Sequence, residues 1–117
     1  MRRPSQRQHQ MDAKTRKRLK QIAHHLDPII AIGDQGLTDP VAAEVERALT
    51  DHELIKIKIH NPDRDARAQL GKQLAESTDA TIVQRIGKVI VLFRPNPEPK
   101  PGLSNLARFG MRATARA

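Results

Sequence analysis

The sequence predicts an α/β domain of the α+β sandwich type, in which three helices pack on a four-stranded mixed sheet. Three segments repeat apolar residues every three to four positions, as helices do, and four shorter segments are rich in isoleucine, valine and leucine, as strands are. Their order along the chain is helix, strand, helix, strand, helix, strand, strand. Two strand-helix-strand units favour right-handed crossovers and parallel pairing, whereas a closing hairpin is antiparallel, so the sheet should be mixed.

The first helix is predicted to begin at Asp12 and to end before Pro28, because proline cannot continue a helix. Residues 29–32 then form a short apolar strand, and the glycines of residues 33–36 end that strand. The helix buries one face, since apolar residues recur on it at helical spacing. This apolar stripe consists of Leu19, Ile22, Ala23 and Leu26.

The rest of the domain shows the same succession of helix and strand signals. Thr38 is the expected cap of a second helix that runs to about Asp51, and Asp63 is the expected cap of a third that runs to Glu76. Between these helices, residues 54–60 alternate isoleucine and lysine, as a strand with one buried face does. The last two strands form a tight hairpin through Gly87 and span residues 81–86 and 88–94.

Positive charge is concentrated outside the expected folded unit, residues 12–95. The chain has a formal net charge of +8, of which residues 1–11 and 96–117 carry +3 each and the folded unit only +2. We expect residues 1–11 to be a disordered basic extension and residues 96–117 to be a disordered basic tail, since alternating prolines open the latter. Such segments attract polyanions by counterion release without reading sequence.

The composition excludes several classes of function. The chain has no cysteine, which rules out disulfides, thiolate catalysis and cysteine-ligated metal centres. Its apolar runs are much shorter than the ~20 residues that a transmembrane helix needs, and residues 1–10 lack the apolar core of a secretory signal. We therefore expect a cytoplasmic, monomeric protein that has no membrane partner, no small-molecule substrate, no cofactor and no metal, and is not an enzyme.

The most specific motif is a loop with two glycines three residues apart, between a buried strand and a helix start. Glycines allow a tight turn and a close approach of another backbone, and the free amides of the following helix favour an anion. An ordinary turn is an equally valid interpretation of the bare pattern, and the acidic second residue of the loop opposes tight phosphate contact. The loop consists of Gly33, Asp34, Gln35 and Gly36.

Basic residues form two further candidate contacts for a polyanion such as a nucleic acid. The first helix is dense in cations with no acid among them, although a solvated helix face would show the same pattern. The strands and the hairpin supply a second group, for which a solvated face is again the alternative. The first group is Lys14, Lys17, Arg18 and Lys20, with Arg16 and His24 as extensions, and the second is Lys56, Lys58, Arg85 and Lys88, with Arg94.

Aromatic usage indicates the mode of binding. The chain contains two phenylalanines, Phe93 and Phe109, and no tyrosine or tryptophan. Because proteins that bind splayed single-stranded bases stack them on aromatic rings, recognition of structured RNA through its backbone and shape is the better fit. A metal-dependent nuclease built on Asp63 and Asp65 is the enzymatic alternative, but a helix cap explains Asp63 more simply.

Four sequence blocks together resemble the bacterial single-domain members of the CRM family, the chloroplast RNA splicing and ribosome maturation domain, of the YhbY type. The resemblance covers about residues 12–95 and implies that this unit is a CRM-like RNA-binding domain. The blocks are Leu26-Asp27-Pro28, Gly33-Asp34-Gln35-Gly36-Leu37-Thr38, His52-Glu53-Leu54-Ile55-Lys56-Ile57-Lys58-Ile59 and Ile86-Gly87-Lys88-Val89-Ile90-Val91-Leu92-Phe93-Arg94-Pro95.

The resemblance implies a fold similar to the C-terminal domain of the third bacterial translation initiation factor. It also implies binding to ribosomal RNA in large-subunit precursors through the GxxG loop, here Gly33 to Gly36, and the neighbouring basic surface. Asp34 departs from the more basic loops of some family members. The alternative function is a general nucleic-acid binder or RNA chaperone that acts by nonspecific charge.

Overall fold

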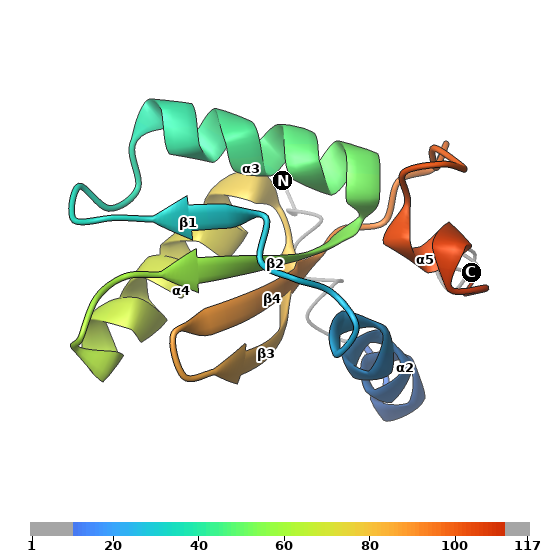
Figure 1. Cartoon of the computed structure of the whole chain (residues 1–117), viewed down its shortest axis with the longest axis horizontal. Helices are drawn as coiled ribbons and strands as arrows, with labels where there is room; N and C mark the ends of the chain where they lie inside the picture. The colour runs from blue at the N-terminus through green and yellow to red at the C-terminus, as the bar shows by residue number, and fades with distance from the viewer. Residues whose placement is uncertain (1–10, 112–117) are drawn as a thin grey trace, which may run out of the picture.

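The computed structural model describes residues 11–111 and confirms the predicted α+β fold (Figure 1). A four-stranded mixed sheet lies between helices on its two faces. One element was not predicted, a short helix close to the end of the described chain. The helices are α2 (Ala13–Ala23), α3 (Asp39–His52), α4 (Arg64–Thr78) and α5 (Asn105–Arg108), and the strands are β1 (Ile30–Ile32), β2 (Leu54–Ile59), β3 (Thr81–Ile86) and β4 (Val89–Phe93).

The strand order across the sheet is β1-β2-β4-β3. Strands β1 and β2 pair in parallel, as the first strand-helix-strand unit predicts, and β3 and β4 form the expected antiparallel hairpin. The second unit differs from the prediction. Strands β2 and β3 run in the same direction but do not pair, because β4 inserts between them and pairs antiparallel with both.

Side-chain caps start the three long helices at the predicted residues. The carboxylate of Asp12 accepts a hydrogen bond from the Thr15 amide at 2.7 Å, and this bond lowers the pKa of Asp12. Thr38 caps α3 and Asp63 caps α4 in the same manner. The caps fix where each helix leaves the preceding loop, which in turn sets the position of the loops described below.

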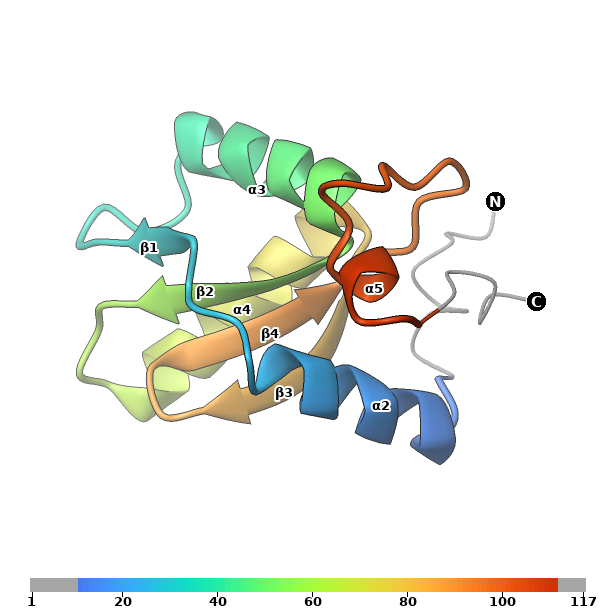
Figure 2. The ribbon, with the colours of Figure 1, turned by 45° about the vertical axis from the view of Figure 1, so that its right-hand side comes forward.

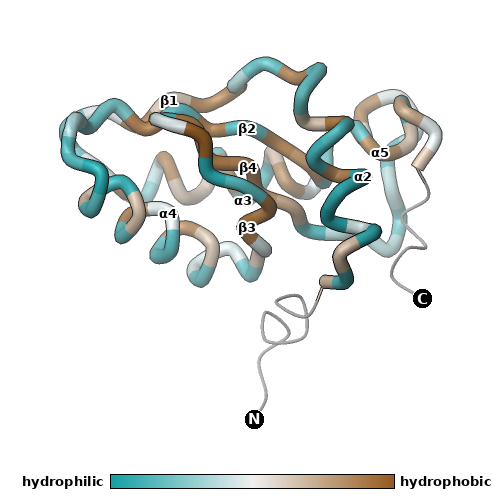
Figure 3. The backbone as a smooth tube through the Cα atoms, turned by 90° about the horizontal axis from the view of Figure 1, so that it is seen from below, coloured by the Kyte–Doolittle hydropathy of each residue, from teal (hydrophilic) through white to brown (hydrophobic). Residues whose placement is uncertain are grey.

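The sheet buries apolar side chains on both faces. Isoleucines of β1 and β2 pack under α3 and α4, whereas Leu54, Val91 and Phe93 pack under α2 and α5. Helix α4 approaches β4 closely at Gly71, where a β-carbon would lie 2.7 Å from Ile90 Cδ1. Figure 3 shows that hydrophobic backbone segments are concentrated in the strands, while the helices alternate between hydrophobic and hydrophilic turns.

Residues 96–111 are ordered, so the prediction of a disordered tail is wrong for this segment. The segment folds back over β2 and α2, where Leu106 is fully buried (Figure 2). Its anchor is Glu53, a buried carboxylate that accepts hydrogen bonds from the Asn96 amide at 2.7 Å and the Ser104 hydroxyl at 2.5 Å. The predicted disorder of residues 1–10 and 112–117 falls outside the described residues.

Candidate nucleic-acid interface

Three loops meet at one edge of the sheet, where β1, β2 and β3 end (Figure 1, left). They are the GxxG loop between β1 and α3, residues 60–63 between β2 and α4, and the β3-β4 turn at Gly87. Strands β1 and β4 are two positions apart in the sheet, a separation of about 10 Å. One RNA helix or strand can therefore contact the GxxG loop and the hairpin at the same time.

The GxxG loop is a tight turn closed by a 3.0 Å hydrogen bond from the Gly36 amide to the Gly33 carbonyl oxygen. Gly36 has a φ of +68°, a conformation that favours glycine. Gly33 has no such requirement, and a β-carbon there would meet no atom of the described chain within 4 Å. The open side of Gly33 leaves room for the close approach of another molecule. Asp34 and Gln35 are exposed at the tip.

A row of side chains crosses the sheet face that α2 and α5 leave uncovered. Strand register places Ala31 beside Lys58, Lys58 beside Val89 and Val89 beside Ile86, all on one face. Lys58 is exposed, and Ile86 is 52% exposed. We call these four residues the open row. It presents a cation with apolar neighbours directly beside the three loops.

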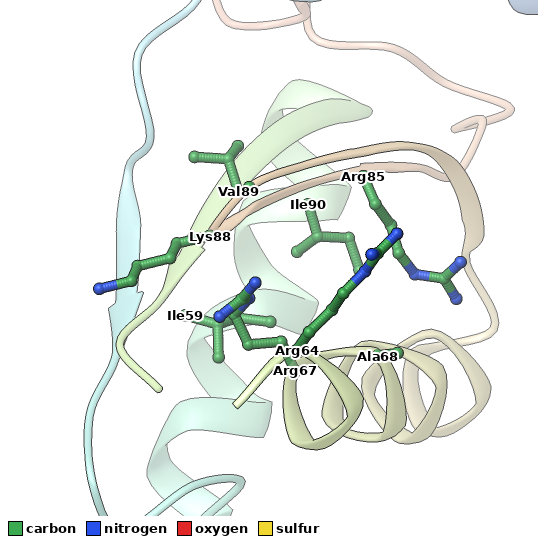
Figure 4. A pocket seen from close by; sticks show the side chains of 9 residues that line it. Ile59, Arg64, Arg67, Ala68, Arg85, Lys88, Val89 and Ile90 are labelled. Atoms are coloured by element: carbon green, nitrogen blue, oxygen red, sulfur yellow. The ribbon is translucent and has the colours of Figure 1, made fainter. Parts of the chain in front are cut away.

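A cleft of about 480 Å³ lies on the other side of the same edge, between the start of α4 and the β3-β4 hairpin. Arg64 and Arg67 of α4 and Arg85 of β3 extend into the space between helix and hairpin, while Lys88 points away from it (Figure 4). The apolar side chains of Ile59, Ala68 and Ile90 line the cleft. We call this feature the arginine cleft.

The structure separates the two predicted basic groups. Helix α2 lies at the opposite end of the long axis from the GxxG loop (Figures 1 and 3). Its exposed lysines, Lys14, Lys17 and Lys20, therefore form a basic face that is separate from the loop edge. Arg18 also lies on α2, but its guanidinium donates a 2.8 Å hydrogen bond to the Phe109 carbonyl oxygen and so ties the C-terminal segment to α2.

Several other predicted basic residues have structural roles. Lys56 donates a 2.9 Å hydrogen bond to the Leu26 carbonyl oxygen and is half-buried. Arg16 donates to the carbonyl oxygens of Ile82 and Val83, where a bulge interrupts the β3-β4 pairing. Arg94 bridges α3 and α4 through Glu46, Thr50 and the Thr78 carbonyl oxygen. These three side chains are therefore less available to RNA than their charge alone indicates.

Of the second predicted group, Lys58, Arg85 and Lys88 all lie near the loop edge, at the ends of β2 and β3 and in the β3-β4 turn. Sequence reasoning missed Arg64 and Arg67. Their spacing of three residues in the first turns of a helix places them on one side of it, and the preceding strand ends at the same edge as the hairpin. This combination of helical spacing and strand order could have identified the two arginines from the sequence.

The two acidic residues considered for a metal site, Asp63 and Asp65, lie at the start of α4. Asp63 acts as the cap of α4, with its carboxylate 3.2 Å from the Asp65 amide, as predicted. Within residues 11–111, no group of three or more histidine, aspartate or glutamate side chains is placed to hold a metal ion. None of the helices within residues 11–111 is both long and apolar enough to span a membrane.

Comparison with known proteins identifies the family. The profile of the CRS1/YhbY (CRM) domain matches residues 11–94. A Pseudomonas aeruginosa protein named "Probable RNA-binding protein" is 46% identical over 94 residues, which are 80% of this chain and 90% of that protein. A Haemophilus influenzae protein named "RNA-binding protein" is 42% identical over 90 residues, covering 77% of this chain and 91% of the relative.

A solved structure agrees with these matches. The solution structure of a hypothetical protein from Staphylococcus aureus superposes with a TM-score of 0.68 at 32% identity, and the match covers 77% of this chain and 94% of that one. The ordered segment from residue 95 to residue 111 follows the family match and adds a small element to the domain. The chain belongs to the CRS1/YhbY (CRM) domain family.

Proposed function

We propose that this protein binds structured RNA at the loop edge of its sheet. The observation that carries the proposal is the meeting of the GxxG loop, the open row and the β3-β4 hairpin at one edge. The edge offers an open backbone at Gly33 and exposed cations at Lys58 and Lys88, which suit contacts to RNA phosphates and sugars. The names of the relatives, which refer to RNA binding, support the same conclusion.

The RNA that we propose is large-subunit ribosomal RNA in a maturing particle, and the protein is then a cytoplasmic assembly factor without catalytic activity. This finer assignment rests on the family resemblance. The loop edge is compatible with it, since it has no phenylalanine, tyrosine or tryptophan on which single-stranded bases could stack. Monomeric action is part of the proposal.

A pair of glycine substitutions tests the loop. Gly33→Ala should leave the fold intact, because its β-carbon meets open space and its φ is not in the left-handed region. If RNA approaches this glycine closely, the added methyl group weakens binding. Gly36→Asp places a side chain at a φ of +68°, and this backbone conformation costs about 1–2 kcal/mol of stability. The added negative charge should weaken RNA binding further. Binding is measured by fluorescence anisotropy, and thermal unfolding by circular dichroism serves as the control for folding.

Full RNA affinity in both folded glycine variants would remove the GxxG loop from the interface. Loss of affinity in Gly33→Ala with an unchanged melting temperature would support direct contact, since nothing inside the described chain requires glycine at that position. Gly102→Ala is the matched control, because this glycine is also exposed and also has room for a β-carbon, but it lies in the C-terminal segment and not at the loop edge.

The basic face of α2 is tested separately from the loop edge. Replacing Lys17 and Arg18 together with glutamate would also break the hydrogen bond from Arg18 to Phe109. Lys14→Glu with Lys17→Glu is cleaner, since both side chains are exposed. If α2 contacts phosphates, the slope of log affinity against log salt becomes shallower by about 0.7–0.9 for each lost contact. An unchanged slope would place α2 outside the interface.

The ribosomal assignment is tested by sucrose-gradient sedimentation of cell extract at low and moderate salt, with each fraction probed for the protein. Accumulation on large-subunit precursors that survives moderate salt supports an assembly factor. A spread over all ribosomal particles, or release to the top of the gradient at moderate salt, contradicts it. Such release would instead favour the second candidate.

The second candidate is a general nucleic-acid binder or RNA chaperone driven by charge. The observation in its favour is that residues 1–11 carry a net charge of +3 in eleven residues. Such a binder does not distinguish polyanions. Equal competition by duplex DNA and ribosomal RNA would support it, whereas strong preference for ribosomal RNA would support the first proposal.

A further inference from the structure

We propose that the arginine cleft holds a phosphodiester group of the RNA backbone. This inference rests on the proposed RNA-binding function and deepens it by adding a second contact on the far side of the loop edge. The cleft combines three guanidinium groups with apolar walls, and no carboxylate lines it. Guanidinium groups match the oxygens of phosphate with paired hydrogen bonds, which makes arginine the preferred residue for phosphate recognition.

The side chains of Arg64 and Arg85 have no partner in the described chain. Residues 11–111 contain two ion pairs, Arg94 with Glu46 and Lys100 with Asp51, and neither involves the cleft. Arginines that serve only stability usually bridge carbonyls or carboxylates, as Arg94 does here. Two unpaired guanidinium groups facing one space repel each other, and an anion between them relieves that repulsion.

Arg67 is positioned by the loop that precedes α4. Its Nη1 atom donates hydrogen bonds to the carbonyl oxygens of Asn61 at 2.7 Å and Pro62 at 3.1 Å. Both bonds use the same nitrogen, so Nη2 remains available for an anion. Because the side chain is already ordered, it loses less conformational entropy on binding than a mobile arginine would.

The apolar walls and the volume favour a nucleotide unit over a free ion. A space of about 480 Å³ is within the range of small-molecule sites, roughly 300–1,000 Å³, and exceeds what a phosphate ion alone occupies. Ile59 and Ile90 form its floor and Ala68 one side. A ribose or base edge can pack on these side chains while its phosphate meets the arginines.

The sheet edge connects the arginine cleft to the rest of the proposed interface. Arg85 lies on the cleft side of β3, whereas its neighbour Ile86 lies in the open row on the opposite face. Lys88, in the turn between β3 and β4, points away from the cleft (Figure 4). The GxxG loop itself contains Asp34 and is followed by Asp39, whereas the hairpin carries Arg85 and Lys88 and no acidic residue, so the strongest phosphate contacts are expected at the hairpin.

The test compares two double variants that remove the same charge. Arg64→Gln with Arg85→Gln empties the cleft of its unpaired cations, while Arg47→Gln with Lys72→Gln removes two exposed cations from α3 and the middle of α4. Affinity of the full chain for a labelled large-subunit ribosomal RNA fragment is measured by fluorescence anisotropy across a salt series. Circular dichroism verifies that both variants melt as the parent does.

We expect the cleft variant to lose affinity about tenfold for each arginine and to reduce the salt slope by about 1.4–1.8. The control variant should lose less than about threefold. Equal losses in the two variants, or an unchanged slope in the cleft variant, would overturn the cleft while leaving RNA binding intact. If the parent chain binds no RNA fragment at all, the proposed function fails instead.

Two competitors separate the RNA backbone from other anions. Uridine monophosphate at millimolar concentration should displace RNA only weakly, because it offers one of several contacts. Polyglutamate should displace the RNA only weakly, as a nonspecific polyanion does. Displacement of RNA by the mononucleotide at micromolar concentration would indicate a small-molecule site, and strong displacement by polyglutamate would indicate an acidic protein partner. Either result would overturn the proposal.

Discussion

Replacing Leu106 with alanine tests whether residues 96–111 form an integral part of the domain. The side chain of Leu106 is 0% exposed and packs in the cluster that contains Leu19, Leu54 and Phe93. Alanine removes three carbon atoms, each worth about 0.8 kcal/mol of transfer free energy, so the loss begins at about 2.4 kcal/mol. A cavity adds to this value, but α5 is only four residues long and can relax toward the sheet.

We therefore expect Leu106→Ala to lower the free energy of unfolding by about 2.4–4 kcal/mol and the melting temperature by roughly 10–20 °C. Urea and thermal unfolding followed by circular dichroism at 222 nm measure both, since the chain lacks tryptophan and tyrosine. Leu103→Ala is the matched control, because this leucine is 43% exposed and should cost no more than about 0.5 kcal/mol. Equal effects of the two substitutions would refute the docking of α5.

Three further predictions concern charged residues in the fold. Asp12→Ala should destabilise the protein most above about pH 4, where the Asp12 carboxylate is charged. The difference in stability from the parent should shrink as the pH falls through the lowered pKa of Asp12. Melting curves from pH 3 to 6 measure this, and a difference in melting temperature that stays constant over this range would contradict a contribution from the charge of the cap. Arg94→Lys should cost about 1–2 kcal/mol in urea unfolding, because one ammonium cannot replace the guanidinium fork that bridges α3 and α4, and no loss would contradict that bridge. Lys100→Ala should raise the pKa of Asp51 toward its usual range, because the Lys100 hydrogen bond is the main cause that lowers it; carboxyl titration by nuclear magnetic resonance would reveal an unchanged pKa if the pair does not form in solution.

Local chemistry in the sequence was sufficient to predict most of the secondary structure. The caps Asp12, Thr38 and Asp63 act within three residues of themselves, so their effect is readable from the chain. The alternation of residues 54–60 likewise predicts a strand because it depends only on the strand repeat. The missed helix α5 carried a weak signal, since four residues after a proline-rich stretch contain too few apolar positions to show periodicity.

The candidate site was only partly readable from the sequence. The GxxG loop was found because its glycines are close together in the chain, and Lys58, Arg85 and Lys88 were found because they lie on recognisable strands or turns. The sequence did not show which of the other cations are free to contact RNA. Lys56 looks equivalent to Lys58 in the strand pattern, yet its ammonium is bound to the Leu26 carbonyl oxygen, a contact set by how the α2-β1 connection crosses the sheet.

The sequence by itself determined the fold class and the positions of most helices and strands, because these depend on local hydrogen bonding and on apolar periodicity. Its four motif blocks, by resemblance, also indicated the family. Only the tertiary structure decided the insertion of β4 between β2 and β3, the docking of residues 96–111 on Glu53, and the meeting of Arg64 and Arg67 with Arg85. Each of these depends on pairings between residues distant in the chain, whose free energies come from burial and hydrogen bonds that no local pattern encodes.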